Sequence, residues 1–280
     1  RRYSECKHFT FLSFDKKLSR DMLAFMGWGI YSTACLMGRN QGTAILLNRF
    51  FGTTINAAFG ISGQVSGQIG FLSNALTTAI NPQIIKAEGA GNRVRMFRLS
   101  EISCKFSFLL MSMVAVPALL YMPTVLDLWL KDVPEHTVMF CSFIILANQI
   151  DLITLNLNTT NQAIGNVKLY NICISSIKIL TIPVMWYILR LGMRPMDAMI
   201  VYVLFEAICS AGRLVFLHFS VGLSITQYFK NVLLLILPPL AVNVAVCYFA
   251  SLYLTGWLFL VTGCISVVVT SVMTYVCGLK

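Results

Sequence analysis

Residues 38–92 read GRNQGTAILLNRFFGTTINAAFGISGQVSGQIGFLSNALTTAINPQIIKAEGAGN. This stretch is apolar enough to be buried, yet it is rich in amides and glycine. Its small and amide residues recur at alternating steps of four and three, which places them on one narrow stripe of a helix. The stripe consists of Asn56, Gly60, Gly63, Gly67, Gly70, Asn74, Thr77 and Asn81. Because glycine is a poor helix former, the stripe predicts that another backbone or a ligand comes close.

The composition of the whole chain indicates a polytopic membrane protein. Of its 280 residues, 57% are hydrophobic and 11% are charged, whereas soluble domains carry about a quarter charged residues. The 21 Lys and Arg residues outnumber the 11 Asp and Glu residues. These cations gather in particular loops, as the positive-inside rule expects, so the excess does not indicate a nucleic-acid partner.

Apolar segments predict an all-α bundle of about eight transmembrane helices. The expected spans are 22–51, 54–85, 106–121, 138–163, 170–189, 198–219, 232–254 and 257–277. The first two exceed the roughly 20 residues needed to cross the hydrocarbon, so tilt or protruding ends are expected. We expect a cytoplasmic linker at 1–20, a six-span lobe at 21–220 and two additional helices at 221–280.

The distribution of cations predicts the orientation of these spans. If the N-terminus is cytoplasmic, most Lys and Arg residues, Arg213 included, fall on the cytoplasmic side. The other side receives only Arg49, Lys131, Arg190 and Arg194. The positive-inside rule therefore predicts that both ends of the chain are cytoplasmic.

Four charges fall near the middle of expected spans: Arg39, Asp151, Lys178 and Glu206. A charge at the bilayer centre costs at least ~2.5 kcal/mol, so each should face protein, water or a partner. Lys178 and Glu206 lie at similar depth and can pair if their helices are antiparallel neighbours. Such a pair is either structural or part of a transport mechanism. Arg39 lies among amides and glycines, which favours contact with a phosphate or a sugar.

The glycine stripe and the polar face of the fourth span have two interpretations each. Small residues four apart are commonest at helix–helix contacts, so packing is the favoured role of the stripe. Gln64 and Gln68 flank it and can present amides to a cavity. Asn81-Pro82 is expected to be a helix end or a hinge. Asn148 and Asp151 share a face of the fourth span, which either joins helices or lines a water path.

Enzyme and metal signatures are lacking in the sequence. The nine cysteines are scattered and form no CxxC pair, which favours free thiols. The three histidines do not cluster with cysteines or carboxylates, so we expect no metal site. The sequence carries no GxSxG, HExxH or Walker loop. We therefore expect neither an enzyme nor a cofactor.

Several runs of the chain resemble bacterial polysaccharide flippases of the multidrug/oligosaccharidyl-lipid/polysaccharide exporter superfamily. They are FMGWGIYS, RNQGTAILLNRFFG, INAAFGISGQV, INPQIIKAEGAGN, LDLWLKDVPEHTVMF and LNTTNQAIGNVKLYN, in this order. The chain is similar to the C-terminal half of that MATE-like fold. Since it opens on Arg1 with no signal-peptide pattern, we expect it to begin within a longer protein whose N-terminal lobe it lacks.

The resemblance implies export of an undecaprenyl-pyrophosphate-linked oligosaccharide across the bacterial inner membrane, by alternating access between two lobes. The motif matches place Arg39, Asn40 and Gln41 on the family's RNQG and Asn81-Pro82 on its NPQI. Asp151 or Glu206 is expected to bind the coupling ion, H⁺ or Na⁺. We expect substrate contacts from Arg39, Asn40, Gln41, Asn48, Gln64, Gln68, Asn148 and Lys178. Hinge or packing roles are expected for Gly60, Gly63, Gly67, Gly70, Asn81 and Pro82.

Two other functions are compatible with the same sequence. An exporter of drugs or other small cations with this fold would favour an acidic or aromatic cavity, whereas Arg39 and Lys178 are cationic. A glycan polymerase, a ligase or an assembly subunit is the other alternative. Polymerases and ligases normally need a large outer loop with catalytic groups, and no outer loop of this sequence is long.

Overall fold

The computed structural model describes residues 15–165, 167–254 and 258–278. In these ranges the regular structure is helical, so the all-α prediction is confirmed for the part of the chain described. The elements, in chain order, are α1 (Lys16–Phe51), α2 (Thr53–Ile69), α3 (Phe71–Gly89), α4 (Arg93–Leu120), α5 (Met122–Trp129), α6 (Thr137–Leu152), α7 (Leu157–Ile164), α8 (Val167–Arg190), α9 (Pro195–Val221), α10 (Ile225–Tyr228), the π-helical turn η2 (Phe229–Leu233), α11 (Leu234–Tyr253) and α12 (Phe259–Gly278).

Five helical segments are long and apolar enough to cross a membrane. They are Arg93–Leu120, Val167–Arg190, Pro195–Val221, Ile225–Tyr253 and Phe259–Cys277. The pair α6 and α7, bent by 41° at its break, gives a sixth span if it is counted as one. These helices fit a polytopic membrane bundle. The expected total of eight spans stays a prediction, because α1 and the α2–α3 pair are more polar.

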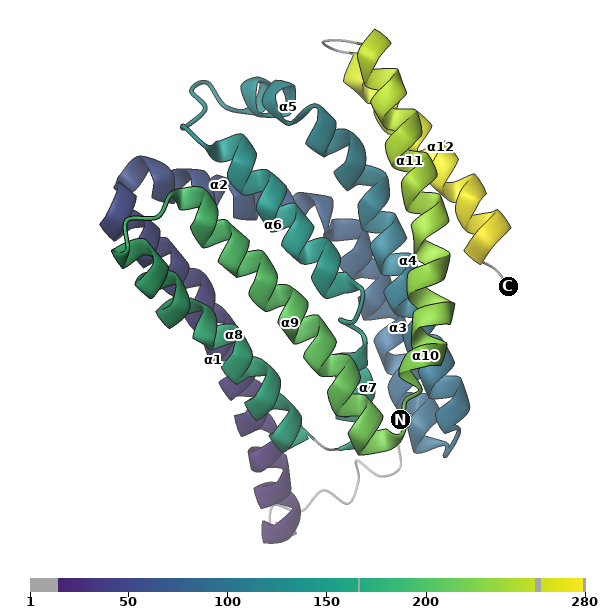
Figure 1. Cartoon of the computed structure of the whole chain (residues 1–280). Coiled ribbons are helices and arrows are strands. Elements are labelled where there is room, and N and C mark those ends of the chain that lie inside the picture. Colours follow the sequence, from purple (N-terminus) through teal and green to yellow (C-terminus); the bar gives the residue numbers. More distant parts are fainter. Residues whose placement is uncertain (1–14, 166, 255–257, 279–280) are drawn as a thin grey trace, which may run out of the picture.

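The helices form a layered bundle in which distant parts of the chain lie side by side. Helix α8 lies against α1, and α9 lies between α8 and α6 (Figure 1). Helix α3 runs along α4, while α11 and α12 pack on α4 and on each other at the edge of the bundle. Helix α9 thereby packs between α8 and α6 with one face, while its other face, which includes Leu204 and Ile208, is exposed.

Two apolar cores hold these helices together. The larger one joins α4, α5, α6, α7, α9 and η2 and contains fully buried Met122, Ile145 and Leu157. The second joins α1, α2, α6, α8 and α9 around Leu47 and Phe140. Between membrane-spanning helices such side chains stabilise the bundle by van der Waals packing rather than by transfer out of water. Helix α6 contributes to both cores.

Glycine permits a close approach of α1 and α8. A Cβ added at Gly42 would lie 2.5 Å from Cδ1 of Ile182, and one added at Gly38 would lie 3.0 Å from Cδ1 of Ile179. A larger residue at either position would require the facing isoleucine side chain to shift. The glycines of the GRNQG run therefore set the spacing that brings Arg39, which lies between them, toward the interior of the bundle.

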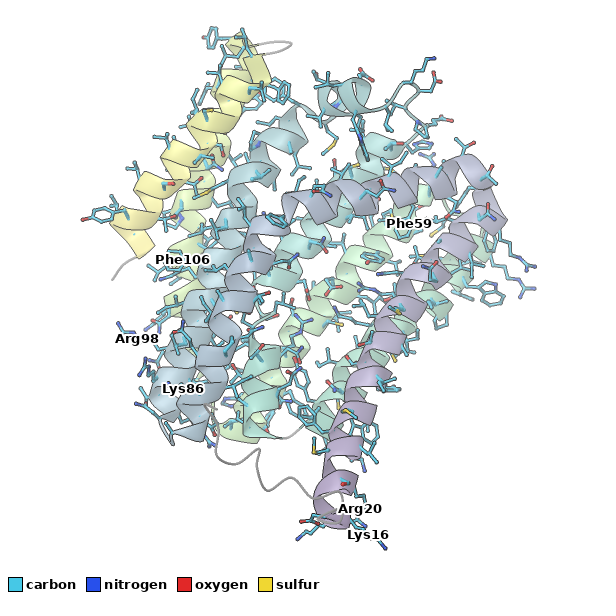
Figure 2. All side chains as sticks on the ribbon, turned by 180° about the vertical axis from the view of Figure 1, so that it is seen from behind. Lys16, Arg20, Phe59, Lys86, Arg98 and Phe106 are labelled. Atoms are coloured by element: carbon cyan, nitrogen blue, oxygen red, sulfur yellow. The ribbon has the colours of Figure 1, made fainter. Side chains whose placement is uncertain are left out.

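The expected second span, 54–85, differs from the structure in two ways. It is interrupted at Gly70, where α2 ends and α3 begins, and the two helices run in different directions (Figure 2). Asn81-Pro82 does not end a helix, because α3 continues to Gly89. The side chain of Asn81 accepts a hydrogen bond from Thr159 Oγ1 at 3.0 Å, which ties α3 to α7 at the proline.

The glycine stripe does not pack against another helix within the described residues. Gly60, Gly63 and Gly67 are exposed, and a Cβ added at any of them would meet no described atom within 4 Å. The buried face of α2 lies beside the stripe and consists of Ile55, Ala58, Ser62, Ser66 and Ile69. The packing expectation is therefore not met at these three glycines within the described residues, because α2 packs its buried face on α6 instead.

Three other boundaries differ from the sequence-based prediction. Residues 93–105, which lie between two expected spans, form the first half of α4. The expected span 138–163 is broken between Leu152 and Leu157. Within the expected linker 1–20, residues 16–20 already belong to α1, and residues 1–14 lie outside the described ranges. The basic residues in these segments lower the hydropathy, but they do not stop helix formation.

Basic side chains gather at one end of the bundle. Lys16, Arg20, Lys86 and Arg98 lie toward the same end, where α1 and α4 begin, whereas Phe59 lies near the opposite end (Figure 2). Such asymmetry is typical of the positive-inside pattern in multi-pass proteins.

Candidate functional site

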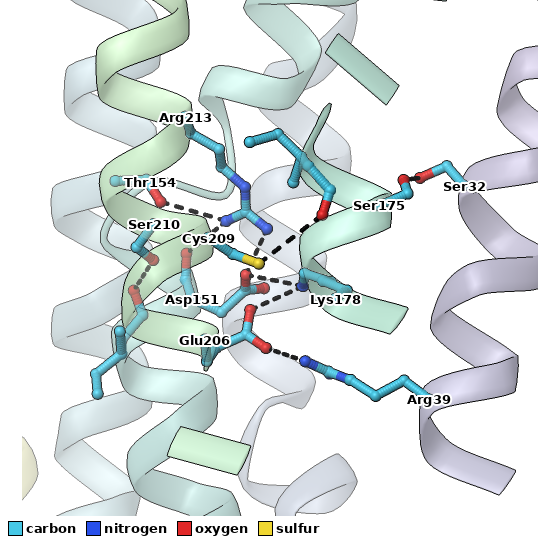
Figure 3. Close-up of polar contacts among 12 residues, drawn as sticks. Ser32, Arg39, Asp151, Thr154, Ser175, Lys178, Glu206, Cys209, Ser210 and Arg213 are labelled. Carbon is cyan, nitrogen blue, oxygen red and sulfur yellow. Dashed lines mark hydrogen bonds and ion pairs between the residues drawn. The ribbon is translucent and has the colours of Figure 1, made fainter. Parts of the chain in front are cut away.

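Five charged side chains from four helices form one continuous chain of ion pairs, here named the charge cluster (Figure 3). Arg39 of α1 pairs with Glu206 of α9. The other carboxylate oxygen of Glu206 lies 2.7 Å from Lys178 Nζ of α8. Lys178 Nζ is 3.4 Å from Asp151 Oδ1 of α6, which lies 2.6 Å from Arg213 Nη2. The pairing of Lys178 with Glu206, which their similar depth suggested, is confirmed.

The charge cluster is buried and carries a surplus of positive charge. The side chains of Arg39, Glu206 and Arg213 are 5%, 3% and 5% exposed, and Asp151 is the most accessible at 20%. With these groups ionised, three cations face two carboxylates, which leaves one unmatched positive charge. Buried ion pairs are often no more stabilising than apolar packing. Their presence inside an apolar bundle is therefore weak evidence for a purely structural role and favours a functional one.

Tyr202 and Asn40 extend the cluster at the Arg39 end. Arg39 Nη2 donates a hydrogen bond to Tyr202 OH at 2.9 Å, and the tyrosine hydroxyl donates to Asn40 Oδ1 at 3.1 Å. The guanidinium carbon of Arg39 lies 4.4 Å from the centroid of the Tyr202 ring. These contacts fix the direction of the guanidinium.

Helix periodicity explains why these residues meet. On α9, Tyr202, Glu206 and Arg213 are separated by four and seven residues, so they share one face. On α8, Ser175 and Lys178 follow the same rule, and Ser175 Oγ donates to Ser32 Oγ of α1 at 2.9 Å. Both faces point to α1 and to the end of α6, because α8 and α9 lie side by side (Figures 1 and 3).

The break between α6 and α7 lies directly beside Asp151. A broken helix leaves backbone carbonyls without intrahelical donors, and in a membrane protein these must find other partners. Side chains from α9 and α10 donate to them: Ser210 Oγ to Ile150 O at 2.9 Å, Arg213 Nη1 to Asp151 O at 3.4 Å, and Tyr228 OH to Ile153 O at 2.5 Å. Arg213 also donates to Thr154 Oγ1 at 3.2 Å. Arg213 thus links the charge cluster to the conformation of the break.

A polar cavity of about 330 Å³ opens onto the charge cluster. All five members of the cluster line it, together with amide and hydroxyl groups that include Asn40, Asn148, Asn158, Asn171, Ser32, Ser175, Tyr170 and Tyr202. The guanidinium of Arg39 therefore lines this cavity and does not lie on the outer surface of the bundle. The Nε atoms of Arg39 and Arg213 are buried and have no hydrogen-bond partner among the described residues.

The structure brings some expected site residues to this cavity and places others elsewhere. Arg39, Asn40, Asn148, Lys178 and both expected ion-coupling carboxylates line it. Asn148 also donates to Ser66 Oγ of α2 at 2.7 Å. Gln41 and Gln64 line a second recess of about 450 Å³ between α1 and α2, which Asn40 borders as well. Asn48 is exposed farther along α1, past Gln41.

Gln68 borders an apolar groove of about 780 Å³ between α2, α4, α5 and α12. Its walls are mostly aliphatic and aromatic, with Val65, Pro117, Trp129 and Phe259 among them. Gln64 lines both this groove and the recess beside α1. Gln64 and Gln68 of α2 thus lie along the exposed stripe, between the polar recess beside α1 and this apolar groove.

Sequence reasoning missed Arg213, Tyr202 and Thr154, as well as several hydroxyl and amide groups of the cavity wall, and it misplaced Arg213. Arg213 was expected on the cytoplasmic side, but it is 4% exposed inside the bundle because it binds Asp151. Tyr202 and Thr154 were not predicted as site residues. The seven-residue spacing between Glu206 and Arg213, with Tyr202 one turn earlier, is the signal that could have found two of them.

Within the described ranges, no group of three or more His, Cys, Asp or Glu side chains is placed to hold a metal ion. The eight cysteines in these ranges are free thiols, and Cys6 lies outside them. Comparison of the chain with protein-family models, with curated proteins and with solved structures gave no match.

Proposed function

We propose that the chain is one helical lobe of a bacterial inner-membrane translocator. Its cargo is a lipid-linked oligosaccharide, carried on undecaprenyl pyrophosphate from the cytoplasmic to the periplasmic leaflet. The observation that carries the proposal is the charge cluster: five buried charges, with one cation in surplus, line a polar cavity inside an apolar helical bundle. Intramembrane charges of this kind mark substrate and ion pathways.

The chemistry of the cargo fits three surfaces of the chain. A pyrophosphate requires cations, and Arg39 and Lys178 supply them in the polar cavity. Sugars require amide and hydroxyl partners, which Asn40, Asn148 and Gln41 offer in the cavity and the neighbouring recess. The polyprenyl chain requires an apolar path, and the groove bordered by Gln68 is open to the lipid side of α12.

Exchange of ion-pair partners can couple the cargo to an ion. In the structure, Glu206 is bound by Arg39 and Lys178, and Asp151 is bound by Lys178 and Arg213. An anionic cargo competes with these carboxylates for the same cations. A carboxylate released in this way takes up H⁺ or Na⁺, so that cargo and ion affect each other's affinity reciprocally. Arg213 carries this change to the α6–α7 break through Asp151 and Thr154.

The broken helix and the open stripe support alternating access. Discontinuous helices at a binding site are typical of transporters whose halves rock against each other. The break after Leu152 provides the bend in this lobe. The exposed glycines of α2 leave a narrow polar surface on which a second lobe can approach closely.

Replacement of Arg39 by Ala tests the proposal. When the full-length protein that contains this chain is the only flippase of the cell, we expect its Arg39→Ala variant to lose glycan export, because one of the two cations offered to the pyrophosphate is lost. Arg39→Lys should keep part of the export, and Arg49→Ala, which removes an exposed cation from the same helix, should export normally. Full export by a folded Arg39→Ala variant would reject the assignment. Protection against cationic drugs in an efflux-deficient strain would favour a multidrug exporter instead.

A further inference from the structure

Another recess, distinct from the polar cavity and from the recess between α1 and α2, lies at the basic end of the bundle. Charged side chains line its walls. It has a volume of about 670 Å³ and lies between the first half of α4 and the segment that joins α9 to α11. None of its lining residues lines the polar cavity. Figure 2 shows Arg98 close to the basic end and Phe106 farther along the same helix, both at the outer edge of the bundle.

The walls of this recess, here named the α4–α10 recess, carry a net positive charge. Arg98 is exposed at its mouth, whereas Lys105 is only 5% exposed. Glu101 lies between them on the same face of α4 and accepts a hydrogen bond from Asn231 Nδ2 of η2 at 3.0 Å. The ammonium of Lys105 lies 5.6 Å from the centroid of the Phe106 ring, which also lines the recess.

Polar and apolar groups are separated within the recess. Gln227 and Asn231 are four residues apart on the α10–η2 segment and add amide groups to the wall that carries the charges. Ile102, Phe106 and Leu235 line it toward the middle of the bundle. A charged mouth at the basic end and an apolar floor match a ligand with an anionic head and a hydrocarbon tail. A free inorganic anion would contact only the charged groups at the mouth of the recess and not its apolar floor.

We propose that the α4–α10 recess binds the headgroup of an anionic phospholipid. Its phosphate contacts Arg98, with Lys105 supplying the second positive charge, while Gln227 and Asn231 donate to headgroup oxygens. The acyl chains leave along Phe106 and Leu235. Basic pockets between transmembrane helices at the cytoplasmic side bind acidic headgroups in this manner. The site needs none of the charge cluster, so it is independent of the proposed translocation.

Lipid binding to the whole purified chain in detergent, followed by native mass spectrometry, tests this site. The probes are phosphatidylglycerol and phosphatidylcholine with identical acyl chains, and inorganic phosphate alone. We expect phosphatidylglycerol to bind at least about fivefold more tightly than phosphatidylcholine, and Arg98→Gln to remove most of that preference. The matched control is Arg95→Gln, an exposed cation one turn earlier on α4 that does not line the recess. It should leave the preference unchanged.

Three results would overturn the site. An equal loss in Arg95→Gln and Arg98→Gln would show attraction to general surface charge. An unchanged preference in Arg98→Gln would remove Arg98 from the binding surface. Displacement of the lipid by inorganic phosphate at similar concentrations would assign the recess to a free anion. Because Arg98 is exposed, its replacement is not expected to unfold the protein, and a thermal unfolding curve checks this. Lys105→Met gives a second, buried perturbation that should also weaken phosphatidylglycerol.

Discussion

Lys178 is the residue on which the balance of charge depends. It lies between two carboxylates, whereas Arg39 and Arg213 each have one of their own. Without Lys178 the remaining groups form two complete pairs, Arg39 with Glu206 and Arg213 with Asp151. A substitution at Lys178 can therefore remove the surplus positive charge while both ion pairs stay intact. It tests the functional role of that charge separately from the structural role of the ion pairs.

We predict that Lys178→Met folds normally but fails to export the glycan, because the cavity becomes neutral while both outer ion pairs persist. Lys178→Arg keeps the charge and should retain export. Glycan export in cells checks the predicted loss of function, and thermal unfolding of the purified protein checks the predicted normal folding. Normal export by Lys178→Met would contradict a role for the surplus charge, and a fully unfolded variant would make Lys178 structural.

Asp151 behaves differently, because its loss leaves two cations poorly compensated. We predict that Asp151→Asn lowers the free energy of unfolding by about 3–5 kcal/mol, the usual cost of breaking a buried pair. Arg213→Gln in the same chain should recover part of this loss. Unfolding in increasing dodecyl sulfate measures both variants. Equal stabilities of Asp151→Asn and the unmodified protein would show that Arg213 does not depend on this carboxylate.

At the residue scale, the sequence indicated four of the five charges and one of their pairings, that of Lys178 with Glu206. Arg39, Asp151, Lys178 and Glu206 were all recognisable as charges inside apolar segments. Which carboxylate Arg39 meets depends on how α1, α8 and α9 are rotated and spaced, and periodicity within a single helix does not contain that information. Arg213 was misplaced because a cation near the end of a span usually lies outside it.

At the element scale, glycines of similar spacing have opposite surroundings. Gly38 and Gly42 lie against isoleucines of α8, whereas Gly60, Gly63 and Gly67 lie open. Periodicity predicts a stripe in both cases. Only the arrangement of helices determines whether a partner covers it within the described residues.

We predict that Gly42→Val destabilises the protein by about 1–3 kcal/mol, since the added methyl groups enter space held by Ile182. Replacing Ile182 by Ala in the same chain should restore part of the stability. Gly63→Ala serves as the matched control and should be neutral or stabilising, because alanine favours a helix and no described atom lies near its Cβ. Dodecyl sulfate unfolding compares the three. A neutral Gly42→Val would contradict the close contact of α1 and α8.

Some helix boundaries could be predicted from sequence patterns alone. The expected spans 170–189, 198–219 and 232–254 match α8, α9 and α11 to within three residues. They are apolar and are bounded by turns or polar residues. The break between α6 and α7 was not predicted, since residues 153–156 carry no glycine or proline and are held open by donors from Arg213 and Tyr228. Such long-range donors leave no trace in the local sequence.

At the scale of the whole molecule, polar groups occupy separate regions of an otherwise apolar bundle. The charge cluster lies in the interior among α1, α6, α8 and α9, and the basic residues of α1 and α4 lie at one end. Composition predicted a membrane protein, and the five long apolar helices agree with it. Composition does not predict how deeply the polar cavity lies within the bundle, because its position depends on the break between α6 and α7 and on the close approach of α1 to α8.

The central claim is that the polar cavity is filled with water inside the membrane, and thiol labelling in intact membranes tests it most directly. In a background with all nine cysteines replaced, Ser32→Cys puts a thiol of nearly the same size in the wall of the cavity. Val268→Cys, exposed on α12 at the edge of the bundle, is the control. We predict rapid reaction of a charged, water-soluble reagent with the thiol at position 32 and slow reaction at position 268. Equally slow reaction at both positions would contradict a wet chamber and, with it, the translocator.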